Sequence, residues 1–329
     1  MSATQTSTTT NNINNNGGAP RVSPPETSFK ARTGMGRFFA GEDASAVYEA
    51  AERLTGPVAT PLVEHAGLTK SKNIMTTRRH PIQVLDMACG TGVVSAHLHQ
   101  ALKALGPEAQ KNVQLTCADI SESQIDHVRQ RIQTQGWKNT IAVQTNAENT
   151  ALPDNNFDVI MIGMALMLIP DPRSTVRECF RMLKPSGTFA TSTWLVEGWV
   201  PDTRDAIAAA NLPGNPPWPQ SSDELVAAWA MGPWHSPAFV ESMYRAAGYV
   251  DVKTDVVTRH IEMHDADDFN FIFRAFVRVV TDVYWTQKQR EECLPLVPAA
   301  FKQFLESKYG VGKGFTVERT SIMASGRKP

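Results

Sequence analysis

The sequence predicts an α/β protein in which helices cover both faces of a mainly parallel β-sheet. Two features between residues 82 and 194 carry this prediction. Five short runs rich in apolar and β-branched residues alternate with segments of helical spacing, and a turn of small residues, Ala88–Gly92, follows the first run. Strands that alternate with helices form a three-layer structure that binds ligands at the carboxyl ends of its strands.

The apolar pattern predicts each element of this stretch in turn. The helix after the first strand has Val94, Leu98 and Leu102 on one face and ends at Gly106. The next helix begins after Ser121, a favoured N-cap residue. The predicted strands are residues 82–87, 113–118, 141–144, 157–162 and 188–194.

Two further predictions concern the segment before the first strand. Residues 1–27 are mostly Ser, Thr, Asn, Gly and Pro. They have little to bury and lack the pattern of a signal peptide, so we expect a disordered tail. Helical spacing then predicts one helix over residues 44–54 that stops before Pro57, and a second short helix that reaches His65.

The regular pattern breaks after the fifth strand. Residues 196–237 contain seven prolines and four tryptophans among weak helical stretches, and we interpret them as a helical insertion. Within it, Asn215–Trp218 is interpreted as a proline-rich loop. Regular signals then return as a helix around 239–247, a strand at 250–257, helices around 269–285 and 287–307, and a closing strand at 315–324.

Composition limits the possible partners. The chain has 329 residues, of which 42% are apolar and 20% charged, as in an ordinary globular protein. Its 32 basic and 33 acidic residues leave a net charge of −1, so it has no excess charge with which to bind nucleic acid. The longest apolar run, 159–169, is shorter than the roughly 20 residues that a membrane span needs. We expect a small-molecule substrate, no nucleic acid and no membrane span, while the oligomeric state stays open.

The cysteines indicate a reducing setting. Cys89, Cys117, Cys179 and Cys293 are far apart and show no paired spacing. This distribution argues against a disulfide framework and against a metal site. A cytoplasmic location fits best.

An acid lies at the end of each of the first two predicted strands. Asp86 precedes the small residues of the turn, which let the backbone approach a ligand closely. Asp119 ends the second strand, where a carboxylate can accept both hydroxyls of a ribose. A dinucleotide-binding turn would need a third glycine at Val93 or Ser95. Structural roles for the two acids, in the turn and at a helix N-terminus, stay open.

An ordered set of motifs resembles one family. The set is Leu85–Gly92, Asp119, Asn146-Ala147-Glu148, Leu152-Pro153, Phe157-Asp158 and Leu183–Gly187. In this order it is similar to the class I S-adenosylmethionine-dependent methyltransferases of the ubiquinone and menaquinone biosynthesis type, in the branch that modifies small molecules. The likeness covers about residues 80–195 and the final strand.

The resemblance implies a fold and its parts. A Rossmann-like three-layer sandwich would contain a mainly parallel seven-stranded sheet with an antiparallel last strand. Residues 28–329 would form one methyltransferase domain after the tail. Its parts would be an N-terminal helical cap (28–80), a cofactor-binding core (81–195), an insertion that acts as a substrate lid (196–237) and the rest of the sheet with added helices (238–329).

The resemblance also implies roles for particular residues. The turn would hold the methionine part of S-adenosylmethionine, Asp119 would bind the ribose, and Ile120 would pack on the adenine ring. Asn146 and Ala147 would contact the adenine edge, while Gly163 and Met164 would lie beside the sulfonium. Two positions depart from the family pattern: Ala88 replaces a glycine, and Asn146 a frequent aspartate. The implied cofactor residues are Asp86, Ala88, Cys89, Gly90, Thr91, Gly92, Asp119, Ile120, Ser121, Asn146, Ala147, Glu148, Gly163 and Met164.

The acceptor site is less clearly marked. Aromatic walls suit a flat or apolar small molecule, although ordinary core packing is the alternative for each ring. His235 is the candidate general base. The candidate substrate residues are Phe39, Tyr48, Met167, Trp194, Trp199, Trp234 and Phe273.

Methyl transfer to an oxygen, nitrogen or sulfur of a small molecule, in secondary metabolism, is the leading functional hypothesis. A noncatalytic or regulatory protein on the same fold is the first alternative. A nicotinamide-dependent oxidoreductase is the second, although its ribose acid should lie about 20 residues beyond the glycines, nearer than Asp119.

Overall fold

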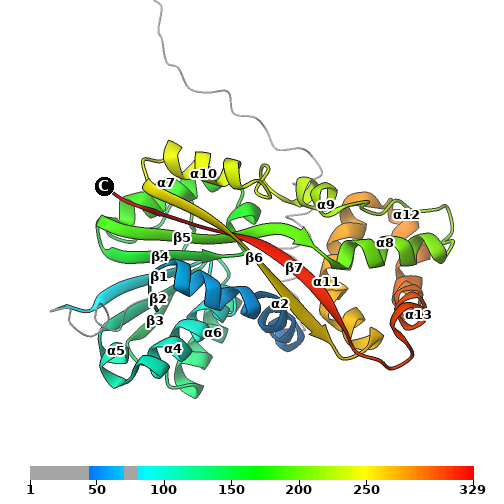
Figure 1. Cartoon of the computed structure of the whole chain (residues 1–329), viewed down its shortest axis with the longest axis horizontal. Coiled ribbons are helices and arrows are strands. Elements are labelled where there is room, and N and C mark those ends of the chain that lie inside the picture. Colours follow the sequence, from blue (N-terminus) through cyan, green and yellow to red (C-terminus); the bar gives the residue numbers. More distant parts are fainter. Residues whose placement is uncertain (1–43, 70–79) are drawn as a thin grey trace, which may run out of the picture.

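The computed structural model describes residues 44–69 and 80–329. Its centre is a seven-stranded sheet with helices on both faces, as predicted (Figure 1). The strand order is β3-β2-β1-β4-β5-β7-β6. β7 is antiparallel to both neighbours and the other pairs are parallel, which confirms the Rossmann-like sheet. The strands are β1 (Ile82–Met87), β2 (Val113–Asp119), β3 (Thr140–Gln144), β4 (Phe157–Gly163), β5 (Leu183–Glu197), β6 (Val250–Met263) and β7 (Phe315–Arg327).

The central strand β1 is covered on both faces. Val84, Leu85 and Met87 have no exposed surface, which is why a run of large apolar residues suits this position. β2 pairs with one edge of β1 and β4 with the other, so the order of the strands along the chain reverses here. In open α/β sheets ligands bind at such a point, beyond the carboxyl ends of the strands.

Helices form the two outer layers. On one face α2 (Ala44–His65) packs against α4 (Val93–Leu105), and on the other α7 (Pro172–Met182) packs against α10 (Pro237–Ala246) (Figure 1). The other short helices of this part are α5 (Pro107–Lys111), α6 (Glu122–Thr134) and the 3₁₀ turn η1 (Leu166–Leu168).

The segment before β1 corrects one prediction. The expected helix break at Pro57 is wrong, because α2 continues through Pro57 and Pro61 as one helix. Leu54, Val58 and Leu62 are buried on one side of α2, which packs against α4. This burial outweighs the backbone hydrogen bonds that the prolines remove. The predicted tail lies outside the described residues.

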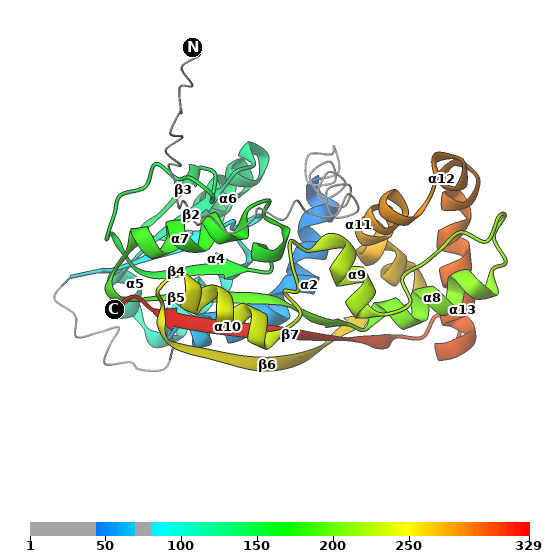
Figure 2. The same ribbon diagram turned by 90° about the horizontal axis from the view of Figure 1, so that it is seen from above.

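A second group of helices lies beyond the carboxyl end of β5 (Figure 2). The 215–218 segment is a loop between α8 and α9, as predicted. The single helix expected over 287–307 is wrong, because Pro295 lies at a 3₁₀ turn that separates α12 from α13. None of the described helices is long and apolar enough to cross a membrane. The group consists of α8 (Trp199–Ala209), α9 (Ser222–Trp229), α11 (Ala266–Tyr284), α12 (Gln287–Cys293), η2 (Leu294–Leu296) and α13 (Val297–Tyr309).

Candidate active site

The residues that follow β1, Ala88–Gly92, form a turn that we call the glycine turn. Ala88 and Gly90 both have φ of 54°, and Gly92 has φ of 80°. Glycine adopts such angles freely, whereas the Cβ of alanine makes them cost about 1 kcal/mol. A Cβ on Gly92 would also lie 3.2 Å from Cγ2 of Val128. The backbone path therefore requires the small residues of the motif.

Asp86 lies at the base of the glycine turn and is fully buried. Its Oδ2 accepts hydrogen bonds from the backbone N–H (3.1 Å) and the hydroxyl (2.6 Å) of Ser95. Its Oδ1 has no hydrogen-bond partner among the described residues. Burial raises the pKa of this carboxyl to about 7, so a bound cation would stabilise its ionised form.

Asp119 connects the glycine turn to the end of β2. Its Oδ2 accepts the backbone N–H of Gly90 at 2.9 Å, and its Oδ1 accepts that of Ser121 at 2.9 Å. Burial raises the pKa of Asp119. Ser121 is the N-cap residue of α6, as predicted, but its hydroxyl makes no capping hydrogen bond. It lies 3.0 Å from the Ser123 hydroxyl instead. Ile120, between the two, leaves 65% of its surface exposed.

The loop after β3 is held by its own side chains. Asn146 Oδ1 accepts the backbone N–H of Glu148 at 3.0 Å, and Glu148 Oε1 accepts that of Asp171 at 2.6 Å. Asn146 itself is exposed and Ala147 is buried. The amide oxygen of Asn146 thus already accepts one hydrogen bond, and the contact of Asn146 with an adenine edge stays a prediction.

The end of β4 packs closely against α4 and β5. A Cβ on Gly163 would lie 2.6 Å from Cγ2 of Val94 in α4. Met164 follows with φ of 54°, and its backbone N–H donates to the carbonyl of Ser192 at 3.0 Å. A non-glycine residue in this conformation is strained, and such strain is common at binding sites.

A contact that the sequence did not reveal connects α2 to the glycine turn. The buried Arg131 donates from Nη1 to the backbone oxygen of Thr91 at 2.9 Å and forms an ion pair with Glu52. Its guanidinium lies 5.0 Å from the ring centroid of Trp137. No local pattern marks this contact, because its residues come from three separate segments.

Five aromatic side chains pack together around the carboxyl end of β5, and we call them the tryptophan box. The Trp194 and Trp229 ring centroids are 5.7 Å apart, and the Trp229 and Phe276 centroids 5.5 Å apart. Phe273 lies 5.4 Å from Trp199. The structure thus brings together three of the predicted substrate residues, Trp194, Trp199 and Phe273. Trp229 was not predicted, since it lies in a weak helical stretch.

Two other candidates lie in η1 and in the segment between α9 and α10. Met167 is buried, and its carbonyl accepts the backbone N–H of Met231 at 2.9 Å. Trp234 is buried as well, and its carbonyl accepts the Thr193 hydroxyl at 3.1 Å. These bonds attach the segment between α9 and α10 to the carboxyl edge of the sheet.

For the remaining candidates, His235, Tyr48 and Phe39, the structure gives few contacts or none. His235 is half-buried in the same segment, and its Nδ1 has no partner among the described residues. Tyr48 belongs to α2, but its side chain lies outside the described part, as does all of Phe39. The role of His235 as a base stays a prediction.

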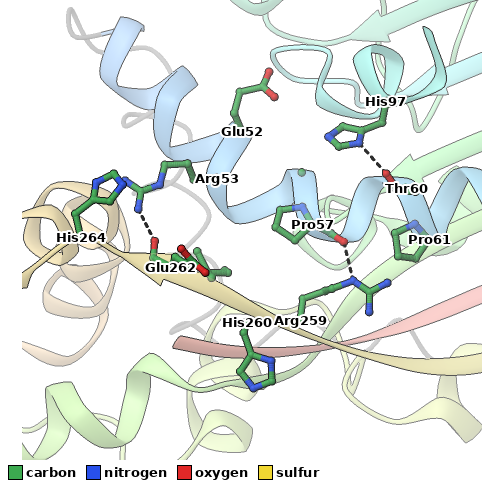
Figure 3. A pocket seen from close by; sticks show the side chains of 12 residues that line it. Glu52, Arg53, Pro57, Thr60, Pro61, His97, Arg259, His260, Glu262 and His264 are labelled. Carbon is green, nitrogen blue, oxygen red and sulfur yellow. Dashed lines mark hydrogen bonds between the residues drawn. The ribbon is translucent and has the colours of Figure 1, made fainter. Parts of the chain in front are cut away.

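A cavity of about 640 Å³ lies beside α2, facing α4 and the end of β6 (Figure 3). Figure 3 shows the His97 ring turned toward the Thr60 hydroxyl, 2.8 Å away, and Arg259 donating to the carbonyl of Pro57 at 3.2 Å. Glu52 lines this cavity and is also the partner of Arg131. The cavity therefore borders the contact that reaches the glycine turn.

Comparison with known proteins places the chain in a family. Residues 85–191, from β1 to β5, match the profile of a methyltransferase domain. The chain is 31% identical over 271 residues to the methyltransferase tpcH of Aspergillus fumigatus, across 82% of this chain and 91% of that protein. It is 32% identical over 295 residues to the acetylaranotin bis-thiomethyltransferase of Aspergillus terreus, across 90% and 97%.

A bacterial protein matches the core alone. The demethylmenaquinone methyltransferase of Listeria monocytogenes is 34% identical over 119 residues, which is 35% of this chain and 47% of that protein. The fungal proteins, by contrast, match along nearly their whole length. The chain is therefore an enzyme that belongs to the S-adenosylmethionine-dependent methyltransferases.

Proposed function

We propose that this enzyme transfers the methyl group of S-adenosylmethionine to a thiol of a small molecule and releases S-adenosylhomocysteine. The observation that supports the cofactor site most strongly is the geometry of Asp119. Two backbone N–H groups orient its carboxylate beside the exposed Ile120. A carboxylate has about four lone-pair sites, so Asp119 keeps the capacity to accept two ribose hydroxyls.

The groups around the glycine turn fit the cofactor. The exposed side chain of Ile120 can pack on an adenine ring. Oδ1 of Asp86, which has no partner among the residues that the structure describes, suits a positively charged ligand. The proposed cofactor residues are Asp86, Ala88, Cys89, Gly90, Thr91, Gly92, Asp119, Ile120, Ser121, Asn146, Ala147, Glu148, Gly163 and Met164.

A thiol is the acceptor that best suits the tryptophan box. Indole and phenyl rings are not bases at neutral pH, so an acceptor bound there has to supply its own anion. A thiol of pKa about 8.5 does so more readily than a phenol of pKa about 10. The bis-thiomethyltransferase, which matches 90% of this chain, supports the same choice by its name.

The chain's own contribution would be placement and exclusion of water. Methyl transfer from a sulfonium is an in-line displacement, and holding both reactants in line supplies much of the acceleration. Gly163 and Met164 are held between α4 and β5. They would determine the position of the sulfonium methyl group relative to the acceptor. Buried aromatic rings would keep water from the thiolate.

The setting of the reaction is also part of the proposal. All four cysteines are free and buried, which suits a reducing cytoplasm. The near-neutral net charge of −1 favours a small molecule over nucleic acid as the partner.

A matched set of acceptors tests the proposal. We would incubate the chain with S-adenosylmethionine labelled in its methyl group and with para-acetamidothiophenol, para-acetamidophenol or para-aminoacetanilide. These share one framework and differ in the sulfur, oxygen or nitrogen nucleophile. We expect label only in the thiol product, and faster transfer as the pH rises toward the thiol pKa. Preferred labelling of the phenol or the amine would overturn the thiol assignment.

A further inference from the structure

Two indole N–H groups of the tryptophan box have no hydrogen-bond partner in the described part of the chain. The side chains of Trp194 and Trp229 are buried, with 3% and 1% of their surface exposed, and Nε1 of each is unpaired among the described residues. Trp199, in the same box, donates from Nε1 to Glu197 Oε2 at 2.9 Å. Trp218 donates to the Thr203 hydroxyl at 3.0 Å. The unpaired state therefore distinguishes two tryptophans from their buried neighbours.

Burial of an unpaired donor is unfavourable. Leaving a buried N–H without an acceptor costs about 1–3 kcal/mol, and most buried polar groups are paired. The rings of Trp194 and Trp229 meet edge to face at 68°, so an N–H···π contact can engage one of the two and leaves the other. Trp229 stacks on Phe276 at 22°, so the Phe276 ring face does not receive the in-plane N–H of Trp229.

A third unpaired polar group lies next to them. Ser321 of β7 is the cross-strand partner of Trp194, and directly opposite residues project from the same face of a sheet. Ser321 is fully buried, and its hydroxyl has no partner among the described residues. Two indole N–H groups and one hydroxyl in an aromatic setting thus lack a hydrogen-bond acceptor or donor among the described residues.

The box lies beside the proposed reaction centre. Trp194 follows Ser192 by two residues in β5, so the two side chains share a face of the sheet. Ser192 is the residue that receives the backbone N–H of Met164. Phe276, at the other side of the box, is only half-buried, so the box reaches the protein surface there.

We propose that the tryptophan box is the acceptor subsite, in which the N–H groups of Trp194 and Trp229 and the hydroxyl of Ser321 bind a carbonyl oxygen. The acceptor would then be a compact, largely apolar thiol that carries an amide or ketone. This inference rests on the proposed function for the thiol, whereas the carbonyl follows from the unpaired donors.

Binding measurements separate the carbonyl from the thiol. Calorimetry would compare para-acetamidothiophenol with para-tert-butylthiophenol, which lacks the carbonyl, in the presence of S-adenosylhomocysteine. The chain should bind the amide more tightly. Trp194→Phe and Trp229→Phe keep an aromatic ring but remove the donor, so each should weaken amide binding about five- to tenfold and leave binding of the tert-butyl thiol unchanged. Trp218→Phe is the matched control, because it removes an indole donor that is already paired.

The indole N–H signals provide a second readout. The chain has seven tryptophans, and the Phe variants identify the NMR signals of Trp194 and Trp229. Both signals should move downfield when the amide thiol is added, whereas that of Trp218 should stay in place. Equal affinity for the two thiols, binding of neither, or unmoved signals would overturn the subsite. Calorimetry with S-adenosylmethionine alone tests the cofactor site independently of this result.

Discussion

The two proposed sides of the site are built in different ways. On the proposed cofactor side, the groups come from one stretch, Asp86–Met164, and lie at the carboxyl ends of β1, β2 and β4 or in the segments that follow β1, β2, β3 and β4. Short-range geometry places them, as when Asp119 accepts the N–H groups of Gly90 and Ser121. On the acceptor side, the tryptophan box draws on β5, α8, α9 and α11, which meet only in the folded protein.

The difference has a physical reason. A cofactor shared by a family needs the same backbone path each time, and small residues in left-handed conformations enforce that path locally. The proposed acceptor side is formed by side-chain packing, which tolerates exchange of residues. The comparisons with known proteins agree with this contrast between a shared core and a variable remainder. The bacterial relative aligns over 35% of the chain, whereas the fungal relatives align over more than four-fifths of it.

The largest expected effect concerns the ion pair that stabilises the acceptor side. Arg319 and Glu197 are 3% and 2% exposed, and Arg319 Nε lies 2.8 Å from Glu197 Oε1. Arg319 also donates to the carbonyl of Leu54 in α2 at 2.7 Å. Arg319→Met would leave a buried carboxylate unpaired, so the free energy of unfolding in urea should fall by about 3–5 kcal/mol.

The exposed pair between Arg327 and Asp251 is the matched control for this measurement. Both side chains are more than half exposed, and Arg327→Met should change the free energy of unfolding by less than about 1 kcal/mol. Similar losses in the two variants would show that long-range burial does not determine the stability of the acceptor side.

A smaller effect is expected from protonation on the cofactor side. Burial raises the pKa of Asp86 to about 7, so the folded protein holds this proton more strongly than the unfolded chain. The stabilisation from the proton is complete at low pH, below the unfolded pKa, and is lost as the pH rises through about 7. The positively charged cofactor favours the ionised carboxylate, so its binding should release a proton near neutral pH.

The affinity for S-adenosylmethionine should therefore rise up to about tenfold from pH 6 to pH 8. Calorimetry in buffers of different ionisation enthalpy measures the released proton. Asp86→Asn removes this titration and separates it from that of the cofactor's own amino group. Proton release that persists in Asp86→Asn would show that another group titrates.

The sequence predicted the fold around the glycine turn because the signals there are local. Asp86, Asp119 and the glycine turn stand where a strand pattern ends, and the fold follows from the alternation of strands and helices. The contact between Arg131 and Thr91 was not predicted, because no local sequence pattern indicates that these two segments meet in the folded protein.

Predictions failed where packing outweighs local preference. A helix break was predicted at Pro57, yet α2 continues through it because its buried face packs on α4. β6 was expected to end at residue 257 but runs to Met263, since pairing with β7 supports its polar residues. Trp229 carried no motif at all, and only tertiary contacts place it in the tryptophan box.

Calorimetric titration with S-adenosylmethionine of the natural chain, Asp119→Ala and Trp194→Phe tests the central claim most directly. The claim is that the cofactor and acceptor sides bind their molecules through separate groups. We expect the natural chain to bind, Asp119→Ala to lose about 1–3 kcal/mol of binding free energy, and Trp194→Phe to bind as the natural chain does. Absence of binding by the natural chain, unchanged affinity in Asp119→Ala, or an equal loss in both variants would contradict it.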